Sequence, residues 1–186
     1  MLRRIISLSI ALLLGACMQA TLNPMSDANF TARDRQQLAP RVPLEESIGA
    51  LADLRAEGKI RHIGISNVSV DELRRARRLV PIVTVQNRYN YADRSSEEVL
   101  RECEREVITF LPWYPLEAGG SASSTGTLAR IAARHNASPA QIAIAWLLAR
   151  SPITLPIPGT SSVAHLEENV RAIRIRLSPP ELAELS

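Results

Sequence analysis

Four small residues, Gly159, Thr160, Ser161 and Ser162, connect the apolar segment "ITLPIP" to the helix-like segment "VAHLEENV". A helix begins with backbone N–H groups that lack an intrahelical partner and with the positive end of its dipole. A glycine- and hydroxyl-rich turn at such a helix start can bind a phosphate. The same hydroxyls can instead cap the helix. The turn therefore predicts either a nucleotide phosphate site or an ordinary cap.

Neutral polar and aromatic side chains also occur where three other apolar segments end. "HIGISN" ends on Ser66 and Asn67, "IVTVQN" contains Gln86, and "ITFLPW" ends on Trp113. The ends of parallel strands can bring neutral donors and acceptors together at one edge of a sheet. Turn chemistry for the Ser-Asn pair and core packing for Trp113 are the alternatives.

Short apolar segments alternate with helix-like segments from Pro43 onward. We expect strands at "HIGIS", "IVTVQNRYN", "VITFLPWYPL" and "ITLPIPG", each followed by a helix, and a first helix in "PLEESIGALADLRAEG". This order predicts an α/β fold with a parallel sheet covered by helices. It fits part of a (β/α) barrel or an open doubly wound sheet. No Gly-x-Gly-x-x-Gly follows the first strand, which disfavours the dinucleotide-binding open sheet.

Three helix-like segments carry the spacing of a capping box, in which a serine precedes an acidic or amide residue by three positions. The predicted pairs are Ser69 with Glu72, Ser95 with Glu98, and Ser138 with Gln141.

The composition is that of a globular protein. The chain has 186 residues, 46% of them hydrophobic, and a net charge of +3. Basic residues alternate with acidic ones along the helix-like segments, which is typical of solvated helix faces and disfavours nucleic-acid binding. Cys17 and Cys103 have no partner at the spacing of a disulfide framework or a metal site. We therefore expect no metal, and a packing role for Cys103.

The first residues have the layout of a secretory signal. Residues 1–20 contain two arginines, an apolar run and small residues before Cys17, and "LGAC" resembles a bacterial lipoprotein signal. The alternative is a fortuitous apolar start on a cytoplasmic chain. Residues 21–41 are polar and predict a linker, which leaves 42–186 as the folded domain. Export with membrane anchoring through Cys17 is the expectation.

Five motifs in order resemble the C-terminal half of the aldo-keto reductases: "GKIRHIGISN", "VQNRYN", "FLPWYPL", "SPAQIAIAWLLAR" and "IPGTSSVAHLEENV". The resemblance covers residues 42–186. It implies a partial (β/α)8 TIM barrel, made of the four C-terminal βα units with parallel strands. It also implies hydride transfer between a nicotinamide cofactor and an aldehyde or ketone.

The resemblance assigns cofactor roles to the residues that match the family's motifs. Those matching positions at the nicotinamide end are Ser66, Asn67 and Gln86 for the carboxamide, Trp113 for stacking, and Tyr114 and Leu116 beside the pyrophosphate.

At the adenosine end, the turn from Gly159 to Ser162 matches the phosphate-binding loop, and Glu168 and Asn169 match residues that hold the adenine. The resemblance favours NADP (NADPH) over NAD. Gly159 and His165 nevertheless stand where many members have a cation for the 2′-phosphate.

The family's proton-donating group of Asp, Tyr, Lys and His comes from the other half of the barrel. Lys59 is the one lysine of the chain and lies in a helix-to-strand turn, and Tyr89 and Tyr91 belong to the matching half. We therefore expect a truncated reductase with weak or no activity and no catalytic residue of its own. The alternatives are a non-catalytic nucleotide-binding or interaction module, or an exported non-functional remnant. The expected partners are a nicotinamide dinucleotide, a carbonyl substrate if the protein is active, and a second copy through open sheet edges.

Overall fold

The computed structural model describes residues 42–116 and 126–186. The expected signal segment with Cys17, and the expected linker, lie outside the described residues. The chain divides into two compact units, residues 1–50 and residues 51–186.

Helix α3, Leu44–Ala56, crosses the boundary between these units. It begins after Pro43, where a proline is compatible with a helix start, and the chain leaves it through Gly58, whose φ of 74° suits glycine. Ile48 is buried. The expected first helix is confirmed.

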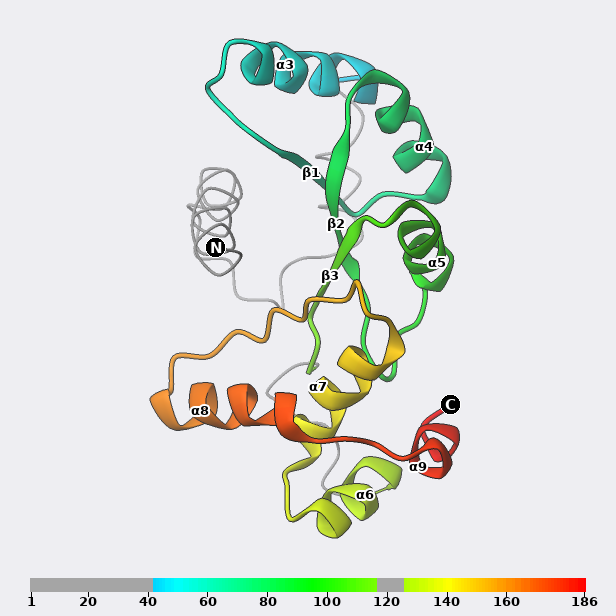
Figure 1. The fold of residues 1–186 in the computed structure, drawn as a ribbon, viewed down its shortest axis with the longest axis vertical. Coiled ribbons are helices and arrows are strands. Elements are labelled where there is room, and N and C mark those ends of the chain that lie inside the picture. Colours follow the sequence, from blue (N-terminus) through cyan, green and yellow to red (C-terminus); the bar gives the residue numbers. More distant parts are fainter. Residues whose placement is uncertain (1–41, 117–125) are drawn as a thin grey trace. The chain divides into compact units, whose positions relative to one another are not determined.

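Strands and helices alternate through the first part of the second unit, and helices follow (Figure 1). The elements are β1 Ile63–Ser66, α4 Val70–Leu79, β2 Ile82–Arg88, α5 Glu97–Glu106, β3 Thr109–Trp113, α6 Thr127–His135, α7 Pro139–Arg150, α8 Val163–Arg171, η3 Ala172–Arg174 and α9 Pro179–Glu184.

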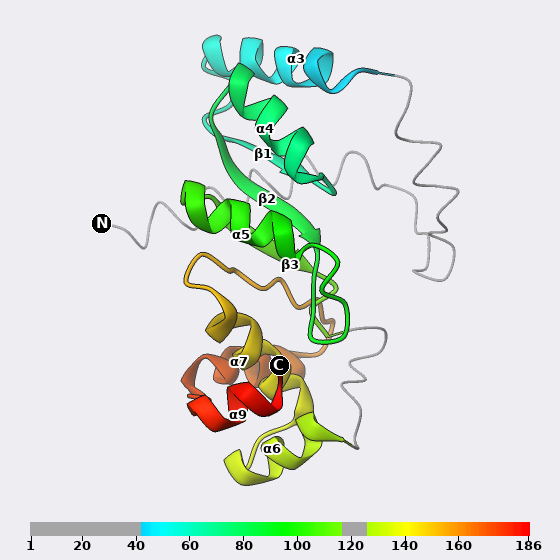
Figure 2. The same cartoon turned by 90° about the vertical axis from the view of Figure 1, so that its right-hand side faces the viewer.

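The sheet has the order β1-β2-β3, and all of its pairings are parallel. Helices α4 and α5 lie on the same side of it (Figures 1 and 2). Leu73 of α4, Leu100 of α5, Val85 of β2 and Phe110 of β3 are all fully buried. The core of this region therefore lies between the sheet and the two helices, as predicted for a parallel sheet.

The prediction of a fourth full strand, at "ITLPIPG", is wrong. The segment that follows α7 runs beside β3 in the parallel sense, but it forms a single bridge, Phe110 to Thr154. Phe110 N–H donates to Ile153 C=O at 2.9 Å, and Leu155 N–H donates to Phe110 C=O at 2.8 Å. The next bond of this ladder would need an N–H at residue 112, which is a proline and has none. Pro112 therefore ends the pairing.

Two of the three predicted capping boxes are confirmed. Ser69 with Glu72 caps α4, and Ser138 with Gln141 caps α7.

The third predicted box was wrong. Helix α5 begins after Ser96, whose side chain makes no capping bond. The Ser95 hydroxyl donates instead to Asp93 at 2.7 Å, because the turn before α5 lets it reach that carboxylate.

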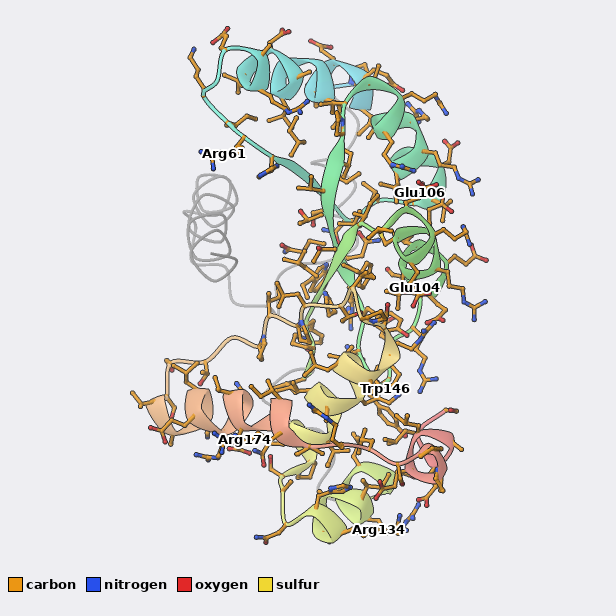
Figure 3. The ribbon with its side chains drawn as sticks, viewed as in Figure 1. Arg61, Glu104, Glu106, Arg134, Trp146 and Arg174 are labelled. Carbon is orange, nitrogen blue, oxygen red and sulfur yellow. The ribbon has the colours of Figure 1, made fainter. Side chains whose placement is uncertain are left out.

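The last helix is held to α6 by charge. Arg130 and Arg134 both pair with Glu184, and His135 Nε2 lies 3.0 Å from Glu181 Oε1. Figure 3 labels Arg134 at this contact. Within the described ranges, no helix is long and apolar enough to cross a membrane.

Candidate functional site

Ser66 and Gln86 lie side by side where β1 and β2 approach their carboxyl ends. They are register partners, and the Ser66 hydroxyl donates to the Gln86 carbonyl oxygen at 2.7 Å. The Asn67 N–H donates to the same oxygen at 2.9 Å. Two donors from the end of β1 therefore fix the backbone at Gln86.

Trp113 joins this group from the end of β3. Its indole N–H donates to the Asn67 side-chain oxygen at 2.7 Å. Asn67 has a φ of 56°, in the left-handed region that asparagine tolerates better than most residues. This conformation follows directly after β1, and the Asn67 carboxamide reaches Trp113 from the other side of β2. The carboxyl-edge cluster, Ser66, Asn67, Gln86 and Trp113, is thus assembled from three strands.

The Gln86 carboxamide is the free polar group of this cluster. It is half-buried, and it makes no hydrogen bond to any described residue. Its NH₂ donor and its oxygen acceptor are both available to a ligand. A primary amide such as that of nicotinamide has the complementary pair of groups.

Arg88 also belongs to this edge, although the sequence reasoning did not single it out. Its guanidinium carbon lies 4.9 Å from the ring centroid of Tyr114 and 5.7 Å from that of Trp113. Its Nε lies 2.9 Å from an Asp93 oxygen. The sequence did contain a signal for Arg88. It lies two residues after Gln86 in β2, and side chains two residues apart in a strand lie on the same face of the sheet.

Tyr114 follows β3 with a φ of 61°. Its carbonyl oxygen accepts from the Asn90 side chain at 3.0 Å. Asn90 is buried and also accepts N–H bonds from Ala92 and Asp93. A buried amide therefore supports the strained turn beside Trp113. Leu116 is half-buried at the end of the first described range.

The Gly159–Ser162 turn precedes α8, and Ser162 is its cap. The Ser162 hydroxyl accepts from His165 N–H at 3.4 Å, and the Thr160 hydroxyl accepts from Ser162 N–H at 3.1 Å. The capping interpretation is confirmed. The amides of Val163 and Ala164 have no partner among the described residues, so the phosphate interpretation stays a prediction.

Glu168 and Asn169 lie on the side of α8 that contacts the rest of the protein. The Gln141 side chain donates to the Glu168 carbonyl at 2.9 Å, and Asn169 is buried. His165 is exposed. The box that caps α7 thus also holds α8.

The predicted cofactor residues form two groups. Hydrogen bonds connect the carboxyl-edge cluster internally, and none among the described residues connects it to the Gly159–Ser162 turn. Both groups follow the carboxyl ends of neighbouring parallel segments, which is the edge where (β/α) barrels bind ligands.

Lys59 and Tyr89 have the side-chain types of a proton-donating pair, but each is bound to a carboxylate elsewhere in the protein. Lys59 is exposed before β1 and lies 2.5 Å from Glu57. The Tyr89 hydroxyl donates to Glu97 at 2.5 Å, and burial raises the pKa of Tyr89 to about 12. The Tyr89 ring stacks on Trp146, which Figure 3 labels on α7. Neither residue is placed as a proton donor.

Cys103 is fully buried, and burial raises the pKa of its thiol to about 12, as expected for a packing residue. The described part of the chain contains no cluster of metal-binding side chains.

The model of the "Aldo/keto reductase family" matches residues 36–186. The chain belongs to this family. It is 44% identical over 149 residues to an uncharacterised oxidoreductase of Schizosaccharomyces pombe, covering 80% of this chain and 49% of that protein. It is 42% identical over 142 residues to pyridoxine 4-dehydrogenase of Escherichia coli, covering 76% of this chain and 49% of that protein. The chain thus spans about half the length of the curated relatives it matches.

Solved structures of family members share its fold. The aldo/keto reductase of Klebsiella pneumoniae, in complex with NADP and acetate, superposes with a TM-score of 0.72 at 30% identity, covering 78% of this chain and 54% of that one. A thermostable aldo-keto reductase gives a TM-score of 0.71 at 37% identity, with 78% and 55% covered. The predicted partial α/β barrel is confirmed. The chain belongs to a family of oxidoreductases that share this fold.

Proposed function

We propose that residues 42–186 form the nicotinamide-dinucleotide-binding part of an aldo-keto reductase barrel, with NADPH favoured over NADH. The carboxyl-edge cluster carries this proposal. It presents an unpaired carboxamide at Gln86 and an aromatic ring at Trp113. Hydrogen bonds from the end of β1 hold the Gln86 backbone, and a hydrogen bond to Asn67 holds the Trp113 indole. An amide-bearing aromatic ring fits such a pair by hydrogen bonding and stacking.

The adenosine end rests on the Gly159–Ser162 turn. It offers the two unpaired amides of Val163 and Ala164 and the positive end of the α8 dipole. A structure of a Klebsiella pneumoniae relative contains NADP, which supports the same class of ligand here. No cation lies in the turn itself, so the preference for NADPH follows the family rather than the local charge.

The inherited reaction is reduction of an aldehyde or ketone. In this proposal the chain holds the cofactor. Among the described residues, Lys59 pairs with Glu57 and Tyr89 with Glu97, so neither is placed to donate a proton to a substrate. This observation favours a second candidate function, a nucleotide-binding module without catalysis. Export through the first 20 residues stays part of the proposal.

Fluorescence titration with NADPH tests the binding. We expect quenching that disappears in Trp113→Phe, because the ligand stacks on Trp113, whereas Trp146 is buried against Tyr89. Gln86→Ala should weaken binding about tenfold through the lost hydrogen bonds. Glu98→Ala, an exposed change on α5, is the matched control and should bind normally. Absence of quenching at millimolar NADPH, in protein with the expected circular dichroism spectrum, would exclude the proposal.

A further inference from the structure

We propose that Arg88 is a substrate-binding residue, and that it selects aldehydes or ketones that also carry a carboxylate. This inference rests on the proposed binding of a nicotinamide cofactor at the carboxyl-edge cluster, and it adds the chemical class of the substrate. The four residues of that cluster are neutral, whereas Arg88 brings a positive charge to the same edge of the sheet. An oxyanion is the ligand group that a guanidinium binds most strongly.

Arg88 lies on the face of β2 that carries Gln86. The alternate residues Asn87 and Tyr89 are buried, and both bond to side chains at the start of α5. Because side chains alternate along a strand, Gln86 and Arg88 share the face away from α5, about 7 Å apart along β2. A ligand whose carboxamide binds Gln86 therefore lies on the same face as the Arg88 side chain.

Two aromatic rings and a carboxylate hold the Arg88 guanidinium in place. Trp113 is the register partner of Arg88 on β3, and the guanidinium carbon lies 5.7 Å from its ring centroid and 4.9 Å from that of Tyr114. Arg88 Nε is buried and lies 2.9 Å from Asp93 Oδ2, as an ion pair and not as an aligned hydrogen bond. These contacts orient the guanidinium before any ligand binds.

The terminal NH₂ groups of Arg88 are its available donors. Neither Nη atom makes a hydrogen bond to a described residue. Since Nε faces Asp93, the two Nη atoms form the remaining, end-on pair of donors. Two parallel N–H groups match the two oxygens of a carboxylate. The Arg88 side chain therefore presents a fixed, charged fork beside the aromatic ring on which we expect the nicotinamide to stack.

The strand order favours a carboxylate of the substrate over a phosphate of the cofactor. The segment that precedes the Gly159–Ser162 turn bridges to β3 on the side away from β2. A dinucleotide that extends from Gln86 to this turn runs across β3, whereas Arg88 lies on β2. Its charge is therefore left for the second ligand, which in the proposed function is the carbonyl substrate.

Calorimetric titration of the full chain saturated with NADP+ tests the selection. The probes are para-carboxybenzaldehyde and para-carbamoylbenzaldehyde, which have nearly the same shape and differ in charge. With the oxidised cofactor, neither aldehyde is reduced during the titration. We expect the carboxylate to bind at least about tenfold more tightly than the amide, because its bonds to Arg88 are charge-assisted.

Variants of Arg88 test whether its charge causes this preference. Arg88→Met keeps an extended side chain and removes the charge, so the preference should disappear while the amide binds as before. Arg88→Lys should keep part of the preference, as a charge without the fork. Arg78→Met is the matched control, because Arg78 is exposed on α4 near the amino end of β2, and it should keep the full preference. Equal weakening of both probes in Arg88→Met would mean that Arg88 only supports Trp113 and would overturn the proposal.

The NADP+ titration is read first and separately. Absence of NADP+ binding would overturn the proposed function and, with it, the role of Arg88. Normal NADP+ binding with equal affinities for the two probes would overturn the role of Arg88 alone. Weaker NADP+ binding in Arg88→Met that Arg88→Lys restores would assign the charge to a cofactor phosphate and would overturn the assignment to the substrate.

Discussion

At the scale of single residues, Glu102 is the most constrained charge in the helix layer. Its side chain is 3% exposed, Arg74 donates to it from Nε at 2.7 Å and from Nη2 at 3.0 Å, and Arg105 donates as well. These hydrogen bonds, with that of Arg74 the largest cause, lower the pKa of Glu102 to about 2. The carboxylate therefore joins α4 to α5 as a charged group.

Glu102→Gln removes the charge and keeps the size of the side chain. We expect a loss of about 1–3 kcal/mol in the free energy of unfolding at pH 7, because the bonds to two guanidinium groups lose their charged acceptor. A lowered folded-state pKa stabilises the protein above the ordinary pKa of 4.5, and this stability is lost as the pH falls toward 2. Urea unfolding between pH 2 and pH 7 should therefore show a weaker pH dependence in the variant.

The matched control is Glu106→Gln on the same helix. Glu106 pairs with Arg77 at 2.5 Å in a more solvated position, and Figure 3 labels it on α5. An exposed pair contributes little, so the expected change is within about 0.5 kcal/mol. Equal losses in the two variants would contradict the special role of Glu102.

At the scale of elements, Gln141 connects the start of α7 to α8. Its oxygen accepts from Ser138 N–H at 3.1 Å, and its NH₂ donates to the Glu168 carbonyl at 2.9 Å. Gln141→Glu keeps the cap but loses the donor. We expect faster amide hydrogen exchange in α8, Val163–Arg171, together with weaker NADPH binding, because the anchored turn becomes mobile.

Ser138→Ala removes the hydroxyl that caps α7 but keeps the bond from Gln141 to the Glu168 carbonyl of α8. It should destabilise the protein by about 1 kcal/mol through the lost cap while leaving exchange in α8 slow. The same exchange pattern in both variants would show that Gln141 acts on α8 only through the stability of α7.

The pairing of β1 with β2 depends on Gly64. A methyl group at this position would overlap the Thr84 hydroxyl oxygen, its neighbour across the ladder. We expect Gly64→Ala to cost about 1–3 kcal/mol, measured by thermal unfolding. Thr84→Ala should recover part of that loss in the double variant, since it removes the overlapping atom.

Gly49→Ala is the control for the Gly64 variant. Its added methyl group meets nothing within 4 Å, and the residue lies inside α3. The change should be neutral or stabilising by up to about 1 kcal/mol. A double variant no more stable than Gly64→Ala alone would locate the strain elsewhere in β1.

At the scale of the whole molecule, we expect the protein to bind NADPH but to reduce aldehydes only slowly. The purified chain should reduce common aldehydes with NADPH at least about 100-fold more slowly than an active family member. The reason is that neither Lys59 nor Tyr89 is placed as a proton donor in the described part of the chain, and a general acid contributes about that much. Spectrophotometric oxidation of NADPH measures it. Turnover comparable to a full-length relative, and abolished by Gln86→Ala, would show that a proton donor is present after all.

Local patterns in the sequence were enough to predict most elements. Caps at Ser69 and Ser138 depend on residues three positions apart, and the alternation of apolar and helical segments depends on neighbours, so both could be found without long-range information. The cofactor residues Gln86 and Trp113 were identified through their motifs and their places at strand ends. Their binding role stays a prediction.

Contacts between distant segments were decided by the tertiary structure alone. Arg74 meets Glu102 from 28 positions away, and Trp113 reaches Asn67 from 46 positions away, so no local pattern could pair them. The prediction of a full fourth strand was wrong for the same reason. The 153–157 segment lies beside β3 only in the tertiary structure, and there Pro112 ends the ladder between them. Sequence specifies which groups are available, and the fold decides which of them meet, since hydrogen bonds and packing require proximity in space.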